Sequence, residues 1–95
     1  MLDILLNNLF SNAIRHNTPN GALHIECREM SLVIKNTGID QPLDPERIFR
    51  RFYRNAAQSE NSGLGLSIIK HICDTTALQV EYTFANSLHC FRIQW

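Results

Sequence analysis

The chain has 95 residues and a formal net charge of zero, with 9 basic and 9 acidic residues. This length fits one domain with a single core, and the balanced charge argues against general attraction to nucleic acid or to a membrane surface. No apolar run reaches the roughly 18 to 20 residues of a membrane span. The three cysteines, Cys27, Cys73 and Cys90, are widely spaced without a CxxC pair, which indicates a reduced, intracellular compartment.

Residues 1–16 are predicted to form an amphipathic helix. Its apolar side chains recur at helical spacing: Leu2, Leu5, Leu6, Leu9, Phe10, Ala13 and Ile14. Asn8 and Asn12 are one turn apart on a neighbouring face, and Arg15 and His16 follow them. The two asparagines are either a solvated polar surface or a pair of amide oxygens directed at a hard cation and its phosphates.

Residues 23–28 alternate between apolar and polar side chains, and after a short turn Leu32 and Ile34 alternate with Val33 and Lys35. This pattern predicts two antiparallel strands joined by a hairpin around residues 29–31. Further on, Asp44 is suited to cap a short helix that has Pro45 at its first position. That predicted helix contains four arginines, the most basic concentration in the chain: Arg47, Arg50, Arg51 and Arg54.

The segment 62–70 places two glycines directly before a second apolar helical pattern, which extends to residue 75. Glycine permits close backbone approach, and the first turn of a helix presents unpaired N–H groups. The segment is therefore either a tight turn that packs the helix or a phosphate-binding loop. Residues 80–84 and 89–93 predict two further strands, joined by a turn at Asn86 and Ser87.

The order of these elements predicts an α+β fold, a two-layer α/β sandwich with helices packed on one face of a mixed, mostly antiparallel sheet. Taken together and in order, segments 8–13, 48–54 and 62–70 resemble the N box, F box and second glycine box of one family. This family is the catalytic ATP-binding domain of bacterial sensor histidine kinases, within the ATPase group of gyrase B, MutL and heat-shock protein 90. The resemblance implies the histidine-kinase/HSP90-type fold, with ATP and Mg²⁺ as cofactors.

The resemblance also implies roles for individual residues. Asn12 matches the magnesium-ligand asparagine, and Asn8 lines the same site one turn earlier. Arg15 and His16 lie where the family places residues against the phosphates and the nucleotide. Arg54 matches the catalytic arginine that reaches the γ-phosphate from the lid. The lid hinge and its contacts with phosphate and base correspond to Gly63, Leu64, Gly65 and Leu66.

The first glycine box departs from the family pattern of Asp-x-Gly-x-Gly, because the matching stretch begins at Asn36, contains Gly38 and ends at Asp40. The family's aspartate accepts a hydrogen bond from the adenine amino group. Asn36 keeps an acceptor oxygen but lacks the charge, and the missing charge weakens such a bond by about 1 kcal/mol.

None of the four histidines lies in a phosphoacceptor motif, and the family's dimerisation helices and its strand before the N-box helix are not found in the sequence. We therefore interpret residues 1–95 as one catalytic domain, a fragment of a larger kinase. The expected location is the cytoplasmic part of a membrane-anchored sensor. The expected partners are the kinase's own dimerisation and phosphoacceptor helices and a response regulator, without nucleic acid or direct membrane contact. An exposed sheet edge would lead the fragment to form a homodimer.

Three functions compete. The first is an enzyme module that binds Mg-ATP and donates the γ-phosphoryl group to a histidine in the separate dimerisation domain, so that the fragment alone does not autophosphorylate. The second is a degenerate docking module that does not bind ATP. The third is a serine kinase of the anti-sigma-factor type, against which the F box argues.

Overall fold

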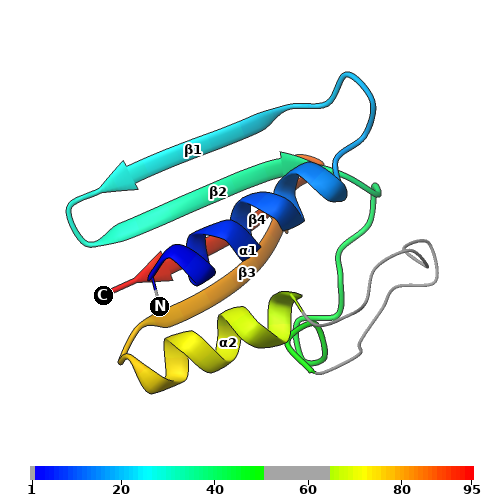
Figure 1. Cartoon of the computed structure of the whole chain (residues 1–95). Coiled ribbons are helices and arrows are strands. Elements are labelled where there is room, and N and C mark those ends of the chain that lie inside the picture. Colours follow the sequence, from blue (N-terminus) through cyan, green and yellow to red (C-terminus); the bar gives the residue numbers. More distant parts are fainter. Residues whose placement is uncertain (1, 51–64) are drawn as a thin grey trace.

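The computed structural model describes residues 2–50 and 65–95, which form two layers (Figure 1). The elements are α1 (Leu2–Arg15), β1 (Leu23–Arg28), β2 (Ser31–Thr37), α2 (Gly65–Thr75), β3 (Gln79–Ala85) and β4 (Leu88–Gln94). The sheet has the order β1-β2-β4-β3, and α1 and α2 cover one of its faces. The predicted α+β sandwich is confirmed. All pairings among the described strands are antiparallel, where a mixed sheet had been expected.

The core lies between the two helices and the central strands. The apolar stripe predicted for the first helix is buried at Leu5, Leu9 and Ala13. The second helix contributes Ile69, Ile72 and Cys73. Opposite them, Ile34 of β2 pairs with Phe91 of β4, and both side chains are buried. Because α1 packs against α2 over this core, the beginning of α2 is held beside the middle of α1.

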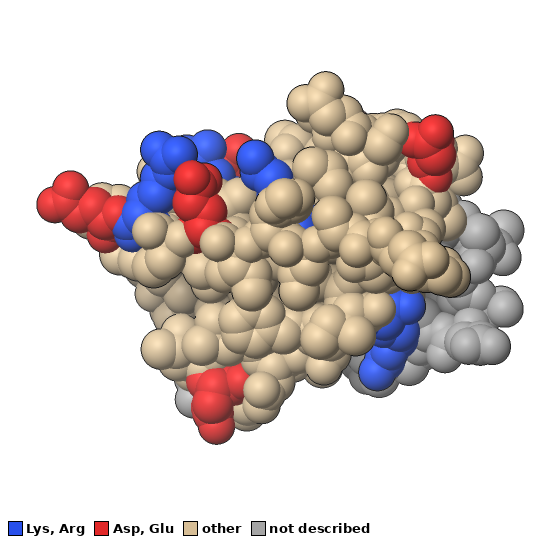
Figure 2. All heavy atoms as spheres, turned by 90° about the horizontal axis from the view of Figure 1, so that it is seen from above, with Lys and Arg blue, Asp and Glu red and all other residues tan. Residues whose placement is uncertain are grey.

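Strand β1 differs from the others because all of its residues are exposed. It pairs with β2 at the edge of the described sheet, and its apolar side chains Leu23 and Ile25 keep 40% and 52% exposure. Viewed from the side of β1, the middle of the surface is largely uncharged, and charged side chains gather toward its margins (Figure 2). Patterning alone predicted the strand, but the structure shows that neither helix covers it.

The prediction of a short helix after Asp44 is wrong for the residues that the structure describes, because residues 45–49 form turns. Asp44 does act as a cap, since its Oδ1 accepts from Glu46 N at 2.9 Å. Its carbonyl oxygen accepts from Ile48 N at 3.0 Å, but the next bond, from Arg50 N to Arg47 O, is the tighter three-residue type. The segment is therefore a pair of successive turns that buries Ile48. Residues 51–54 of the same prediction lie outside the described part of the chain.

The predicted turn between the last two strands is confirmed. Asn86 and Ser87 have φ values of 53° and 62°, the left-handed conformation that a two-residue hairpin of type I′ requires. All three cysteines are free thiols. Among the described helices, none combines the length and the apolar character needed to cross a membrane.

Candidate functional site

Asn8 and Gly65, which come from the N box and the second glycine box, lie next to each other. The Asn8 side chain folds back on its own helix, with Nδ2 donating to Ile4 O at 2.8 Å. Its Oδ1 is then 3.5 Å from the point where a Cβ on Gly65 would lie. The amide oxygen of Asn8 therefore faces the first residue of α2, in the turn whose N–H groups have no acceptor within the helix itself.

Asn12, Arg15 and His16 continue from Asn8 toward the end of α1. Asn12 and His16 are half-buried, whereas Arg15 is exposed, and His16 N donates to Asn12 O at 3.1 Å. Burial lowers the pKa of His16 below its usual range, and the neighbouring charge of Arg15 and the ring of His89 lower this pKa further. His16 is therefore neutral at neutral pH, and Arg15 supplies the positive charge at this end of the helix.

Asn36 lies near the end of β2, directly across from His89 on β4. Its side chain is only 2% exposed. Nδ2 donates to Thr37 O at 2.8 Å, while Oδ1 is buried without a hydrogen-bond partner in the described structure. An unpaired buried acceptor is costly, and native proteins have few of them. The Asn36 oxygen, which is expected to accept a hydrogen bond from the amino group of a base, is thus the atom that has no donor among the described residues.

Gly38 follows Asn36 at a point where only glycine fits. A Cβ there would lie 2.9 Å from His16 O and 3.0 Å from Cδ2 of His89. Contacts of this length exclude a larger residue, so the end of β2 packs directly against the end of α1. Asp40, which replaces the second glycine of the family pattern, is exposed two residues further on.

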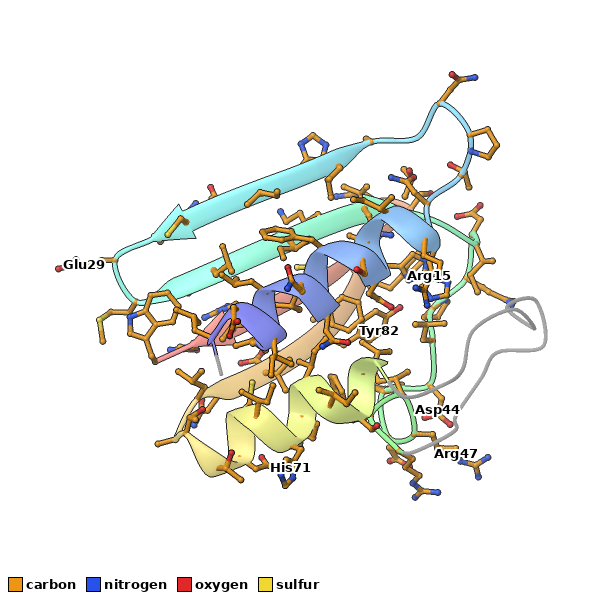
Figure 3. The ribbon with its side chains drawn as sticks, viewed as in Figure 1. Arg15, Glu29, Asp44, Arg47, His71 and Tyr82 are labelled. Carbon is orange, nitrogen blue, oxygen red and sulfur yellow. The ribbon has the colours of Figure 1, made fainter. Side chains whose placement is uncertain are left out.

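The structure thus collects several of the predicted site residues into two contacting groups. Asn8 lies beside Gly65, and His16 lies beside Gly38 and near His89. Arg15, Tyr82 and Asp44 are on the same side of the view in Figure 3, opposite Glu29 in the β1–β2 hairpin. Leu66 packs against the core from α2. Three predicted residues lie outside the described part of the chain, namely Arg54, Gly63 and Leu64.

His89 and Tyr82 occupy this region although the sequence pattern predicted no role for them beyond that of strand residues. His89 is 5% exposed, and its ring nitrogens approach Tyr82 Oη at 2.8 Å and Ile39 O at 2.7 Å. The signal in the sequence was a histidine on the apolar face of a predicted strand, where it shares that face with Phe91 and Ile93. A polar side chain in such a position requires buried partners.

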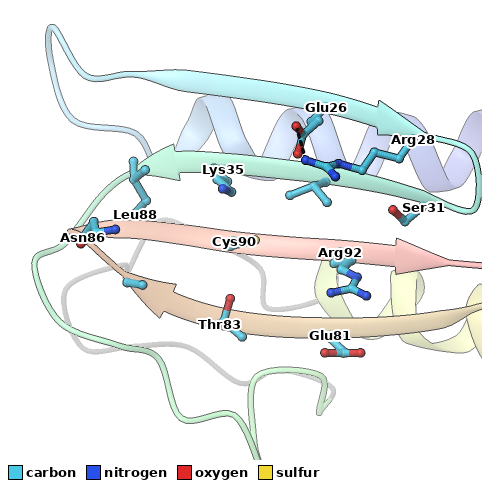
Figure 4. Close-up of a pocket in the computed structure, with 12 residues that line it drawn as sticks. Glu26, Arg28, Ser31, Lys35, Glu81, Thr83, Asn86, Leu88, Cys90 and Arg92 are labelled. Atoms are coloured by element: carbon cyan, nitrogen blue, oxygen red, sulfur yellow. Dashed lines mark hydrogen bonds and ion pairs between the residues drawn. The ribbon is translucent and has the colours of Figure 1, made fainter.

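The helix-free face of the sheet carries a separate hollow of about 430 Å³ (Figure 4). Its lining mixes charged and polar side chains with apolar ones such as Val33 and Leu88. It includes an ion pair between Arg28 and Glu26, with Nη2 and Oε1 2.9 Å apart. None of the predicted site residues lines this hollow. It lies on the opposite side of the sheet from α1 and α2, so it is not part of the candidate nucleotide site.

Residues 1–91 match the family described as histidine kinase-, DNA gyrase B-, and HSP90-like ATPase. The chain therefore belongs to this family of ATPases, whose members bind ATP with Mg²⁺. Within it, the matching curated relatives include sensor histidine kinases. HprS of Escherichia coli K12 is 34% identical over 98% of this chain, and CusS of E. coli O157:H7 is 37% identical over 76%. The chain spans only about a fifth of these relatives, 22% and 17% of their lengths.

Solved structures of histidine kinases share the fold. The nucleotide-free catalytic domain of ThkA matches with a TM-score of 0.71 and 27% identity, over 94% of this chain and 61% of that one. The mycobacterial sensor histidine kinase MprB matches with a TM-score of 0.76 over 95% of this chain and 66% of that one. At 23% identity the MprB match is evidence for the fold alone.

Proposed function

We propose that residues 1–95 are one domain, the ATP-binding catalytic module of a two-component sensor histidine kinase. In this proposal it donates the ATP γ-phosphoryl group to a histidine in a separate dimerisation domain. The observation that carries the proposal is the buried Oδ1 of Asn36, which has no hydrogen-bond partner among the described residues. It lies at the end of β2, which packs against the end of the N-box helix.

The donor set of the described residues fits Mg-ATP. At the end of the site that would hold the base, Asn36 Oδ1, which has no donor among the described residues, can accept a hydrogen bond from an amino group. At the other end, the first turn of α2 begins at Gly65 beside Asn8, and the N–H groups and positive dipole end at the start of a helix suit phosphate. No cluster of three or more acidic, cysteine or histidine ligands occurs among the described residues. A Mg²⁺ ion held mainly by phosphate and water needs only one or two protein oxygens, and Asn12 is proposed to supply one.

Phosphoryl transfer requires placement and charge neutralisation more than covalent chemistry from the protein. Bound Mg-ATP would supply the transferable phosphoryl group and the cation that neutralises its charge. Arg15 is proposed to attract the phosphates from the end of α1. His16, which is neutral because burial lowers its pKa, is proposed to pack against the nucleotide without adding a second charge.

The remaining assignments rest on the family resemblance. Arg54 is proposed as the catalytic arginine that reaches the γ-phosphate, and Gly63 and Leu64 as the lid hinge that precedes Gly65 and Leu66. The proposed partners are the dimerisation and phosphoacceptor helices of the same kinase and a response regulator. The proposed location is the cytoplasmic part of a membrane-anchored sensor, because the matching relatives are sensor kinases.

Calorimetric titration with Mg²⁺ and a non-hydrolysable ATP analogue tests the proposal. We expect the parent to bind, and Asn12→Ala to lose the magnesium-dependent part of the binding while remaining folded. Asn7→Ala is the matched control, since it removes the same amide from an exposed position on the same helix. If Asn12→Ala binds as well as the parent, the metal assignment is wrong.

The second candidate function, a docking module that does not bind ATP, is favoured by the neutral acceptor at position 36. An asparagine oxygen forms a weaker hydrogen bond with an amine than the aspartate of the family pattern would. The same titration separates the two functions, because a folded parent chain that releases no heat with Mg-ATP supports the docking module.

A further inference from the structure

Two polar side chains interrupt the apolar, helix-covered face of β3 and β4. His89 lies between two aromatic rings, with ring centroids 4.8 Å from Phe84 and 6.0 Å from Tyr82. The Tyr82 and His89 rings are near parallel, at 25°. Burying a histidine costs free energy unless both ring nitrogens have partners, so the partners indicate what the residue does.

The hydrogen bonds of His89 assign its tautomer. The Ile39 carbonyl can only accept, so Nε2 carries the hydrogen and donates across 2.7 Å. Nδ1 is then the acceptor, and Tyr82 O–H donates to it across 2.8 Å. The Tyr82 oxygen in turn accepts from Leu43 N at 2.9 Å. These bonds form one directed chain, which runs from Leu43 through Tyr82 and His89 to Ile39.

This chain of hydrogen bonds fastens the segment that follows Asn36. Between Gly38 and Leu43 the backbone belongs to no helix or strand. His89 holds this segment by its hydrogen bond to Ile39 O, and Tyr82 holds it by its hydrogen bond from Leu43 N. The His89 ring also lies directly against Gly38, 3.0 Å from the position of a Cβ there. Two residues of the distant hairpin therefore fix the path of the segment beside the unpaired oxygen of Asn36.

We propose that His89 and Tyr82 are positioning residues for recognition of the nucleotide base. They hold the 38–43 segment against the sheet so that Asn36 Oδ1 meets the amino group of adenine in a fixed geometry. This inference rests on the proposed function, because it concerns the base end of the same site. His89 and Tyr82 act through the backbone of the segment, and neither is assigned a contact with the nucleotide.

A positioning role at the base end predicts a change in base preference. ATP and inosine triphosphate share ribose and phosphates. Inosine triphosphate lacks the amino group from which Asn36 Oδ1 would accept a hydrogen bond. Competition binding against a fluorescent ATP analogue gives the ratio of the two affinities for each variant. We expect Tyr82→Phe to lower the ratio of the affinity for ATP to that for inosine triphosphate about fivefold, the factor expected for one net hydrogen bond. Thr83→Val is the control, because it removes an exposed hydroxyl from the same strand.

His89 offers a rescue experiment. In His89→Gln, the nitrogen of the new side-chain amide can replace Nε2 as donor to Ile39 O, whereas His89→Ala removes both ends of the link. We expect His89→Gln to keep more of the ATP preference than His89→Ala does. Thermal unfolding identifies the variants that are folded at the assay temperature, and only these are compared.

The outcomes separate this inference from the proposed function. A narrowed preference in Tyr82→Phe, with Thr83→Val like the parent, supports the inference. An unchanged ratio in Tyr82→Phe, or an equal loss of both nucleotides, overturns it and leaves the proposed function in place. A folded parent chain that binds neither nucleotide overturns both.

Discussion

Asn36→Asp tests how the base end of the site is built, because it changes one buried atom into a charged acceptor. In the parent, Nδ2 of Asn36 donates to Thr37 O at 2.8 Å, and Oδ1 has no partner among the described residues. The aspartate would lose that donor and place a second oxygen near the Thr37 carbonyl. At 2% exposure the carboxylate would also be shielded from water.

These contacts set opposite effects on stability and on binding. Without nucleotide, the lost hydrogen bond and the buried charge should lower the free energy of unfolding by about 1–3 kcal/mol. With nucleotide, a charge-assisted bond to the adenine amine should strengthen binding by about 1 kcal/mol, or about fivefold. The increase in melting temperature on adding Mg-ATP should therefore be larger for the variant than for the parent.

Urea unfolding without ligand and calorimetric titration with the Mg²⁺ complex of an ATP analogue measure the two effects separately. Asn20→Asp adds the same charge at an exposed loop position and should change neither quantity appreciably. A folded Asn36→Asp variant with equal or weaker affinity would refute the reasoning. Position 36 would then not receive the base amine, or its asparagine would be better suited to the task than an aspartate.

The fold and the charges support three further predictions. Incubation with labelled ATP should give no acid-labile phosphate on the isolated chain, since none of its four histidines lies in a phosphoacceptor motif; its appearance would contradict the assignment. Burial lowers the folded-state pKa of His16 below 6.5, so the unfolded chain binds this proton more readily. The free energy of unfolding should be highest above pH 6.5 and should fall as the pH drops through the lower pKa of the folded state. In urea unfolding, the free energy of unfolding of His16→Asn should depend less on pH than that of the parent. Light scattering at about 100 μM should show self-association through the exposed edge β1, which Ile25→Lys should reduce; a monomeric parent would exclude it.

Local patterns were sufficient to predict most of the fold. The helical spacing of Leu5, Leu9 and Ala13 predicted a buried stripe, and the structure buries all three. Asn86 and Ser87 predicted a turn whose left-handed backbone the structure confirms. The helix expected after Asp44 was wrong within the described residues, because a cap and a proline favour a helical start without fixing how far it continues.

The candidate site was only partly predictable because its connections are long-range. The sequence identified Asn36 as an acceptor, but its burial and its unpaired oxygen depend on the packing around it. The link between His89 and Ile39 joins positions 50 residues apart. Alternation along a strand places His89 on the apolar face, but it does not show which loop crosses that face.

The uneven attachment of β1 has a consequence for how the protein opens. Within the described sheet, β1 pairs with β2 on one side and buries none of its side chains. Amide hydrogens of β1 should therefore exchange with solvent at a lower free energy than those of β2, which is held by strands on both sides. When β1 detaches, Asn36 loses its pairing with Leu23 but keeps its pairing with His89. The proposed base end of the nucleotide site would thus persist when β1 unfolds locally.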